Sequence, residues 1–340
     1  MRLPVRSWFL LLLPVVPALR SKYERDGFVK VRNVLSKREC EEIRTAFAAL
    51  FSGDFDSGVY PDEWHWRQGI SREDAVREIV NSWKSSDVVA RVALSERIGK
   101  LVCDLVGWDG ARLGQDDCVW KPPGTGAVGY HRDATYISAN FEPYENNCVT
   151  VWIALDDADE ETGVVEYAKG SHRWQHESGK AFFGGADYRA PAVAAAKAKA
   201  KGGRLEVRSF KVKAGSAIVH HQEVLHGSKP NSSEDRHRRA LVLHFIRDDA
   251  KFRTQPPPDY VYGRYVLSDL PEGHTERTSL RDCFFPLVFA KDGRHLLPSA
   301  YRHRRLRDAH ARARRIVAYT PPPPEPPPPP PHPDGTGVKL

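Results

Sequence analysis

The feature that most constrains the fold of this 340-residue chain is a series of short runs with alternating apolar side chains, all of them after Gly110. Turn-forming segments rich in glycine, proline, asparagine or aspartate bound these runs. Short strands without helices between them form antiparallel sandwiches or barrels rather than parallel α/β sheets. We therefore expect a mainly β domain, with strands at 117–121, 148–155, 163–167, 205–212, 216–221 and 239–246.

The residues before Gly110 carry a helical pattern instead. Residues 36–39 read Ser-Lys-Arg-Glu, a capping box, and apolar side chains follow it at a spacing of three to four. Further helical patterns begin at Ser71 and at Ser86. The expected architecture is a β core with N-terminal helical support, interrupted at 191–203 by a small, flexible insertion.

The N-terminal residues differ in kind from the rest of the chain. Residues 7–18 are almost entirely apolar and follow two arginines. A run of this length is too short to span a bilayer and is typical of the hydrophobic region of a signal peptide. We expect 1–20 to be a leader for the secretory pathway or an organelle rather than for the cytoplasm or the peroxisome. Membrane contact is expected only through an uncleaved leader.

The C-terminal residues account for the basic character of the chain. Residues 281–320 hold ten Lys or Arg against three Asp, which equals the formal net charge of +7 of the whole chain. The remainder is near neutral, so we expect no nucleic-acid partner. We expect a globular domain at 21–280, a basic helical segment at 281–320 and a disordered, proline-rich tail at 321–340. Such a tail could bind an SH3- or WW-like module.

Two histidines and one aspartate provide a candidate metal site. His131 and Asp133 are two residues apart, so their side chains would face the same side of a strand. His226 follows a separate apolar run much later in the chain. Two imidazoles and a carboxylate are the ligand set of non-haem Fe(II) oxygenases, whereas five scattered cysteines give no zinc pattern. His220 and His221 would point to opposite faces, and His221 is the second choice for the third ligand.

Arg238 is a candidate anion-binding residue at the start of the last apolar run. It shares one face of this expected strand with the small side chains of Ala240 and Val242, which leave room for a ligand. A planar guanidinium binds a carboxylate through two hydrogen bonds. This arrangement favours Arg238 over Arg236 and Arg239, and the alternative is that all three are surface arginines in a turn.

At these residues the sequence resembles the phytanoyl-CoA dioxygenase family of Fe(II)/2-oxoglutarate oxygenases. The resemblance implies a double-stranded β-helix core, the jelly roll of cupin-like proteins, with N-terminal helices and an oxygenase domain at about 21–280. The similar segments occur in the family's order, at 23–36, 120–137, 149–174 and 221–245.

The resemblance also implies roles for individual residues. It makes His131, Asp133 and His226 the ligands of Fe(II), and Arg238 the partner of the 5-carboxylate of 2-oxoglutarate. Trp152 matches an aromatic residue beside this cosubstrate, and Tyr136 falls at a position that lines the same pocket. The turn before Arg238 is one residue longer than in the peroxisomal member, which keeps Arg236 open as an alternative. Gln115 is the candidate for a further cosubstrate contact.

The implied reaction is hydroxylation of an unactivated carbon in a small-molecule or acyl substrate. It consumes O2 and 2-oxoglutarate, releases succinate and CO2, and could be stimulated by ascorbate. Halogenating relatives lack the carboxylate ligand, so the presence of Asp133 favours hydroxylation. The alternative is a catalytically silent jelly-roll binding protein, tethered by its leader and its tail.

One further motif has both a functional and a structural interpretation. Asn231, Ser232 and Ser233 match the acceptor sequence for N-glycosylation. Asparagine in such a turn also forms an Asx turn, in which its side chain bonds to the backbone two residues on. We expect the structural role here.

Overall fold

The computed structural model describes residues 15–174, 187–198, 205–254, 262, 265–266 and 275–294. The expected proline-rich tail and most of the expected basic segment lie outside the described residues, as do residues 1–14 of the expected leader. The described part of the basic segment, 281–294, is not the helix that was expected, because it contains a strand, β14 (Leu287–Ala290), that pairs with β4 (Gly110–Lys121). The last residues of that leader begin the first helix, α1 (Val15–Asp26). Among the described residues, no helix combines the length and the apolar character needed to cross a membrane.

Helices support the N-terminal side of the β core, as predicted. Helix α2 (Lys37–Ser52) begins at the predicted capping box, where Ser36 and Glu39 exchange side-chain and backbone hydrogen bonds. The pattern that begins at Ser86 forms two helices instead of one, α3 (Asp87–Ala93) and α4 (Glu96–Val106).

The helix predicted from Ser71 is wrong. Strand β3 (Arg77–Val80) lies there, paired with the short strand β2 (Glu63–Trp64) on one side and with β4 (Gly110–Lys121) on the other. The last two residues, Ile79–Val80, are β-branched and buried by this pairing. Their spacing is compatible with a helix, but burial on a neighbouring strand decides the conformation.

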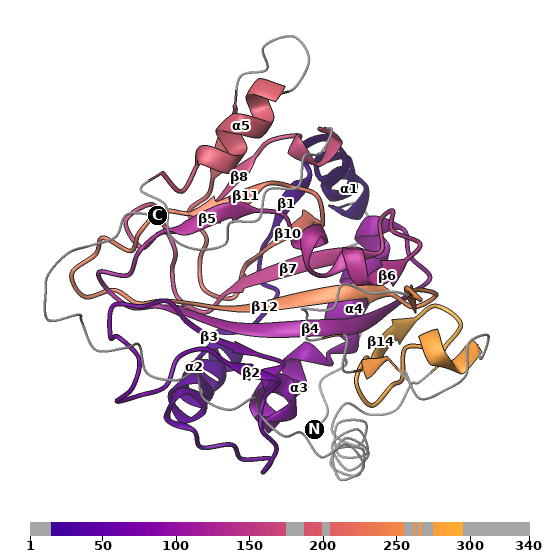
Figure 1. Ribbon diagram of the computed structural model, residues 1–340, viewed down its shortest axis with the longest axis horizontal. Coiled ribbons are helices and arrows are strands. Elements are labelled where there is room, and N and C mark those ends of the chain that lie inside the picture. Colours follow the sequence, from indigo (N-terminus) through magenta and orange to yellow (C-terminus); the bar gives the residue numbers. More distant parts are fainter. Residues whose placement is uncertain are drawn as a thin grey trace, which may run out of the picture.

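Two antiparallel sheets lie on opposite sides of the interior and form a jelly roll (Figure 1). The major sheet has the strand order β1-β10-β7-β12-β4-β3-β2, with β14 also paired to β4, and the minor sheet has the order β5-β11-β8-β9. Every predicted strand region contains a strand, so the mainly β fold is confirmed. The remaining strands of the two sheets are β1 (Phe28–Val31), β5 (Val128–His131), β7 (Cys148–Ala154), β8 (Val165–Ala168), β9 (Val207–Ser209), β10 (Ala217–His221), β11 (His226–Ser228), β12 (Arg238–Arg247) and β14 (Leu287–Ala290). Two short strands, β6 (Phe141–Glu142) and β13 (Lys251–Phe252), form a separate pair.

The two faces of the major sheet have different roles. One face packs against the helices through large apolar side chains, of which β12 provides Leu241, Leu243 and Phe245. Figure 1 shows α2 and α3 on this side and the minor sheet on the other. The opposite face, which we call the inner face, carries Ala240 and Val242 of β12. The predicted core face of this strand is confirmed.

The insertion predicted to be flexible contains a helix, α5 (Ala190–Ala198). Alanine has the highest intrinsic helix propensity, and Ala192 and Ala196 lie four residues apart on the buried side of α5. They pack with Tyr130 of β5 and with Leu225, which directly precedes β11. The prediction of flexibility is therefore wrong for the residues of α5.

Candidate active site

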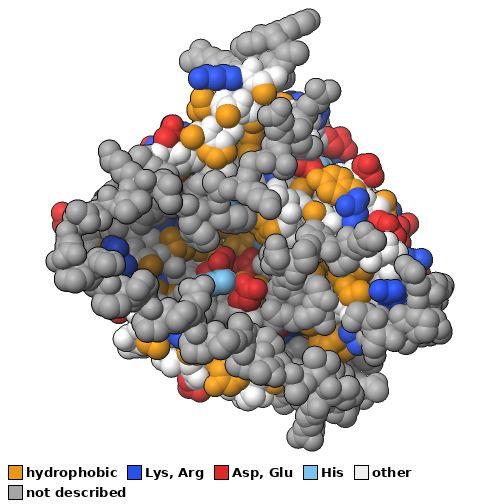
Figure 2. Space-filling model, in the orientation of Figure 1, with side chains coloured by type: hydrophobic (Ala, Val, Ile, Leu, Met, Phe, Trp, Pro, Cys, Tyr) orange, Lys and Arg blue, Asp and Glu red, His pale blue; other side chains and the backbone are white. Residues whose placement is uncertain are grey.

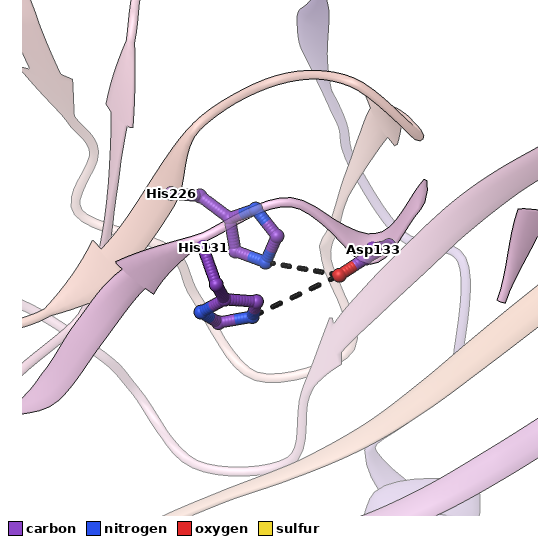
Figure 3. A group of neighbouring side chains, drawn as sticks. All are labelled: His131, Asp133 and His226. Carbon is purple, nitrogen blue, oxygen red and sulfur yellow. Dashed lines mark ion pairs between the residues drawn. The ribbon is translucent and has the colours of Figure 1, made fainter. Parts of the chain in front are cut away.

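The minor sheet brings the predicted metal ligands together. His131 ends β5 and His226 begins β11, and the two residues are direct partners in the antiparallel pairing of these strands. Asp133 follows in a short 3₁₀ turn. Its Oδ1 atom lies 3.4 Å from Nε2 of His226 and 3.8 Å from Nε2 of His131 (Figure 3). One ligand atom from each of the three residues lies within 4.8 Å of the others, which is close enough to surround one metal ion.

The two imidazoles direct their unprotonated nitrogens toward the place where the three ligand atoms converge. Nδ1 of His131 donates to the carbonyl of Gly129 (2.8 Å), and Nδ1 of His226 donates to the carbonyl of Val224 (3.0 Å). Backbone bonds of this kind fix the tautomer, so Nε2 is the unprotonated nitrogen of each ring. Burial lowers the pKa of His131 to about 3 and that of His226 to about 4. Both rings are therefore neutral at pH 7, as a metal ligand requires.

Three side chains donate hydrogen bonds to the buried carboxylate of Asp133. The Tyr136 hydroxyl donates to Oδ1 (2.5 Å), while the Thr150 hydroxyl and Nε2 of His220 (2.9 Å) donate to Oδ2. Burial alone would raise the pKa of Asp133, but the imidazole of His226 and the bond from His220 hold it well below its usual value. Tyr136, expected beside the cosubstrate, thus contacts Asp133, the carboxylate predicted to bind the metal.

The two histidines of β10 point to opposite faces of the strand, as expected. His220 faces the interior and is 2% exposed, whereas Nε2 of His221 bonds to Asn146 (2.7 Å). His221 also packs near Tyr23 of α1, on the other side of the strand. The second choice of His221 as metal ligand is therefore wrong, and His220 contacts the site without being one of the three converging residues.

His244 forms a buried ion pair on the inner face. Its Nε2 lies 2.9 Å from Asp117 and its Nδ1 lies 2.9 Å from the Thr150 hydroxyl. That hydroxyl has one proton, which goes to Asp133, so Nδ1 of His244 must donate to Thr150. Burial would lower the pKa of His244, but the bond to Asp117 raises it well above its usual value. Gln115 donates to Asp117 (2.7 Å) and so belongs to this network.

A second group of buried polar side chains on the inner face contains two basic residues and no acidic one. Arg238 and Lys121 are direct partners in the pairing of β12 with β4, and they are 2% and 0% exposed. Both donate to the hydroxyl of Ser228, Lys121 at 3.1 Å and Arg238 at 3.4 Å. The ring of Trp152 lies 5.6 Å from the guanidinium carbon of Arg238. We call Lys121, Ser228 and Arg238 the anion pocket.

No carboxylate within the described part of the chain forms an ion pair with either cation of the anion pocket, and Nε of Arg238 has no hydrogen-bond partner there. Burial and the charge of Arg238 lower the pKa of Lys121 to about 6, and burial lowers that of Arg238 to about 10. Buried charges are ordinarily paired, so the pocket fits an incoming anion. Sequence reasoning missed Lys121, although a lysine that ends an alternating strand was a signal.

The two alternative arginines lie elsewhere. Arg236 is 39% exposed in its side chain and pairs with Asp159 (2.9 Å) and Glu161 at the surface. Arg239 pairs with Asp156 (2.8 Å). Of the three arginines, Arg238 alone lies in the anion pocket. Figure 2 shows that this face of the molecule is hollowed near its centre, where acidic and histidine side chains lie beside hydrophobic ones.

The turn between His226 and Arg238 is held by Asn231. Its side chain accepts from the backbone of Ser233 (3.2 Å), which confirms the predicted Asx turn. The amide of Asn231 donates to the carbonyls of Lys121 (3.0 Å) and Arg236 (2.7 Å), and the residue is fully buried. One side chain therefore fixes the position of both strands that bear the cations.

Comparisons with known proteins agree with this geometry. A model of the phytanoyl-CoA dioxygenase family matches residues 23–240. The chain is 25% identical over 264 residues to a phytanoyl-CoA dioxygenase domain-containing protein 1 homolog of Caenorhabditis briggsae, covering 67% of this chain and 90% of that one. It is 24% identical over 241 residues to a protein of Stutzerimonas stutzeri named "probable alpha-ketoglutarate-dependent hypophosphite dioxygenase", covering 67% and 78%.

Solved structures share the fold at low sequence identity. The α-ketoglutarate-dependent epimerase SnoN from nogalamycin biosynthesis has a TM-score of 0.59 and 20% identity, with 81% of this chain and 99% of that one covered. EctD from S. alaskensis, bound to 2-oxoglutarate and 5-hydroxyectoine, has a TM-score of 0.56 and 18% identity over 73% and 83%. With the family model spanning more than half of its length, the chain belongs to the phytanoyl-CoA dioxygenase family of Fe(II)- and 2-oxoglutarate-dependent oxygenases.

Proposed function

We propose that this oxygenase hydroxylates an unactivated carbon of a small-molecule or acyl substrate while it converts 2-oxoglutarate and O2 to succinate and CO2. The observation that carries the proposal is the anion pocket, in which the buried cations Lys121 and Arg238 lack a carboxylate partner among the described residues. Ser228 of the pocket and His226 of the candidate metal site both lie on β11, two residues apart. A dicarboxylate would bind with one end in the pocket and the other at the metal.

The residues of the site divide the work of binding. His131, Asp133 and His226 would hold Fe(II), since two neutral imidazoles and an ionised carboxylate are the donors that this metal takes. Bound Fe(II) supplies the one-electron chemistry by which O2 reacts with carbon. Arg238, Lys121 and Ser228 would bind the 5-carboxylate of 2-oxoglutarate, and Trp152 would cover the guanidinium and exclude water from it.

Hydroxylation is favoured by the carboxylate ligand itself. Asp133 is ionised and held by three donors, so it would occupy a metal position that a chloride ion would otherwise need. The named relatives show that this fold also carries epimerase activity. The complete set of three protein ligands supports oxygen transfer as the reaction proposed here.

The test is release of succinate from 2-oxoglutarate by the full chain with Fe(II), ascorbate and O2. The wild-type protein is expected to release succinate, and Asp133→Ala to lose roughly 100-fold or more of this activity, because the metal loses a ligand. Asp157→Ala, which removes a carboxylate 54% exposed in its side chain, is the matched control and should retain activity. Activity that survives in Asp133→Ala would contradict the metal assignment.

The substrate can be sought in the same assay. A pool of metabolites and acyl compounds is incubated with the enzyme under ¹⁸O2, and products are sought that gain one labelled oxygen. Such a product supports hydroxylation, whereas wild-type protein without turnover, coupled or uncoupled, would favour the silent jelly-roll binding protein.

A further inference from the structure

A third imidazole lies against the metal-binding residues. His220 of β10 is 2% exposed, and its ring centroid lies 4.4 Å from that of His226. It belongs to the major sheet, whereas His131 and His226 belong to the minor sheet. The contact therefore joins the two sheets at the site. His220 is not one of the three residues whose ligand atoms converge.

The hydrogen bonds of His220 determine where its proton lies. Nε2 is 2.9 Å from Oδ2 of Asp133, and an ionised carboxylate can only accept. The proton must therefore be on Nε2. Nδ1 lies 3.3 Å from the hydroxyl of Tyr167, its second hydrogen-bond partner. His220 is thus a donor to Asp133 whose ring is held on its other side by a phenol.

The acceptor positions of Asp133 can be counted. An ionised carboxylate offers about four lone-pair sites, two on each oxygen. Thr150 and His220 occupy Oδ2, and Tyr136 occupies one position on Oδ1. One position is left, and it is on Oδ1, the oxygen that faces Nε2 of both His131 and His226.

We propose that His220 is a positioning residue, which with Thr150 keeps Oδ2 of Asp133 occupied so that the carboxylate presents Oδ1 alone to the metal. The inference rests on the proposed function, because it concerns the same metal site. Without His220, Oδ2 would be free to turn toward the metal, where it would occupy space that the cosubstrate needs. The residue therefore preserves open positions and does not itself touch a reacting atom.

The test measures metal binding and geometry in the full-length protein, with Ni(II) and Co(II) as probes that O2 does not oxidise in the assay. His220→Phe keeps a ring of similar size and removes the donor. It is expected to weaken metal binding by roughly tenfold in titration calorimetry, as loss of a residue that orients a ligand does elsewhere. The d–d absorption of bound Co(II) should change as well, because this spectrum reports the number and arrangement of ligand atoms.

Two variants control the result. His220→Gln places an amide donor near the position of Nε2 and is expected to recover metal affinity to within about threefold, from a tenfold loss. His221→Phe changes the neighbouring residue, whose ring points away from the site, and should leave both affinity and spectrum as in the wild type. Should His220→Phe fail to fold, His220→Met removes the donor with a flexible side chain and gives the same comparison.

The outcomes separate the two proposals. If the donor-less variant binds Co(II) with wild-type affinity and spectrum, the positioning role of His220 is overturned, while turnover by the wild type leaves the proposed function standing. A wild-type chain that binds none of Ni(II), Co(II) or Fe(II) would overturn both. Equal losses in the Phe and Gln variants would mean that a hydrogen-bond donor at this position does not restore the site, and would also count against the inference.

Discussion

The inner face of the major sheet carries two groups of buried charge on the same two strands, and they differ in how they are balanced. Asp117 and His244 form an ion pair, and further hydrogen bonds satisfy both partners. Lys121 and Arg238 both donate to the hydroxyl of Ser228, and neither has a carboxylate partner among the described residues. The first group is complete within the protein, whereas the second lacks an anion. This difference identifies the second group as the place for a ligand.

The largest effect is expected from breaking the complete pair. Asp117→Leu leaves the charge of His244 buried without its partner, which should destabilise the fold by about 3–5 kcal/mol. Urea denaturation followed by circular dichroism measures this. The double variant Asp117→Leu/His244→Phe removes both charges and should recover most of the loss. A double variant as unstable as the single one would show that the ion pair is not the cause.

Arg238→Met should reduce activity without reducing stability, the reverse of what is expected for Asp117→Leu. We expect kcat/KM for 2-oxoglutarate to fall about 100-fold, because a buried, doubly hydrogen-bonded carboxylate contact is lost. The folded state should be as stable as the wild type or more stable, since an unpaired buried charge is removed. Steady-state kinetics and thermal melting measure the two properties. Arg239→Met, on the other face of β12, is the control; an equal kinetic loss there would remove the distinction between the faces.

Lys121→Met is expected to have a smaller effect of the same kind. Its amine makes one charged contact where Arg238 makes two, so we expect KM for 2-oxoglutarate to rise roughly tenfold with kcat little changed. Melting temperature should not fall. If Lys121→Met lost stability as Asp117→Leu does, the lysine would stabilise the fold as Asp117 and His244 do. The difference between the two groups would then not hold.

The smallest effect is a dependence of cosubstrate affinity on pH. Lys121 has a pKa of about 6 in the empty pocket, and a bound carboxylate raises it, so binding takes up a proton. Affinity should therefore decrease as pH rises from 6.5 to 8.5, by a total of less than the roughly tenfold expected for Lys121→Met. Titration calorimetry of the Ni(II)-loaded protein with 2-oxoglutarate in two buffers measures how many protons are taken up on binding. The same slope in Lys121→Met would assign the proton to another group.

Sequence patterns within one segment predicted that segment well. The capping box before α2, the two faces of β12 and the pair His131 and Asp133 all depend on residues a few positions apart. What could not be predicted was set by register between distant strands. Lys121 is a partner of Arg238 only because β4 pairs with β12. Likewise, the choice between His220 and His221 depends on which face of β10 meets the minor sheet.

The failed helix from Ser71 has the same physical origin. Its apolar spacing suits a helix in isolation, but the edge of β4 offers hydrogen bonds and burial to a strand. Local propensity is a weak preference that tertiary contacts override.

Because Asn231 is buried, a glycosylating enzyme can reach it only before the turn has folded. Its amide is the atom that a sugar would be attached to, and here that amide joins the strands of Lys121 and Arg238 from inside. Once the turn has closed, the acceptor is out of reach. A chain modified before closure would carry a sugar where the two cations must meet, so folding and modification of this turn exclude each other.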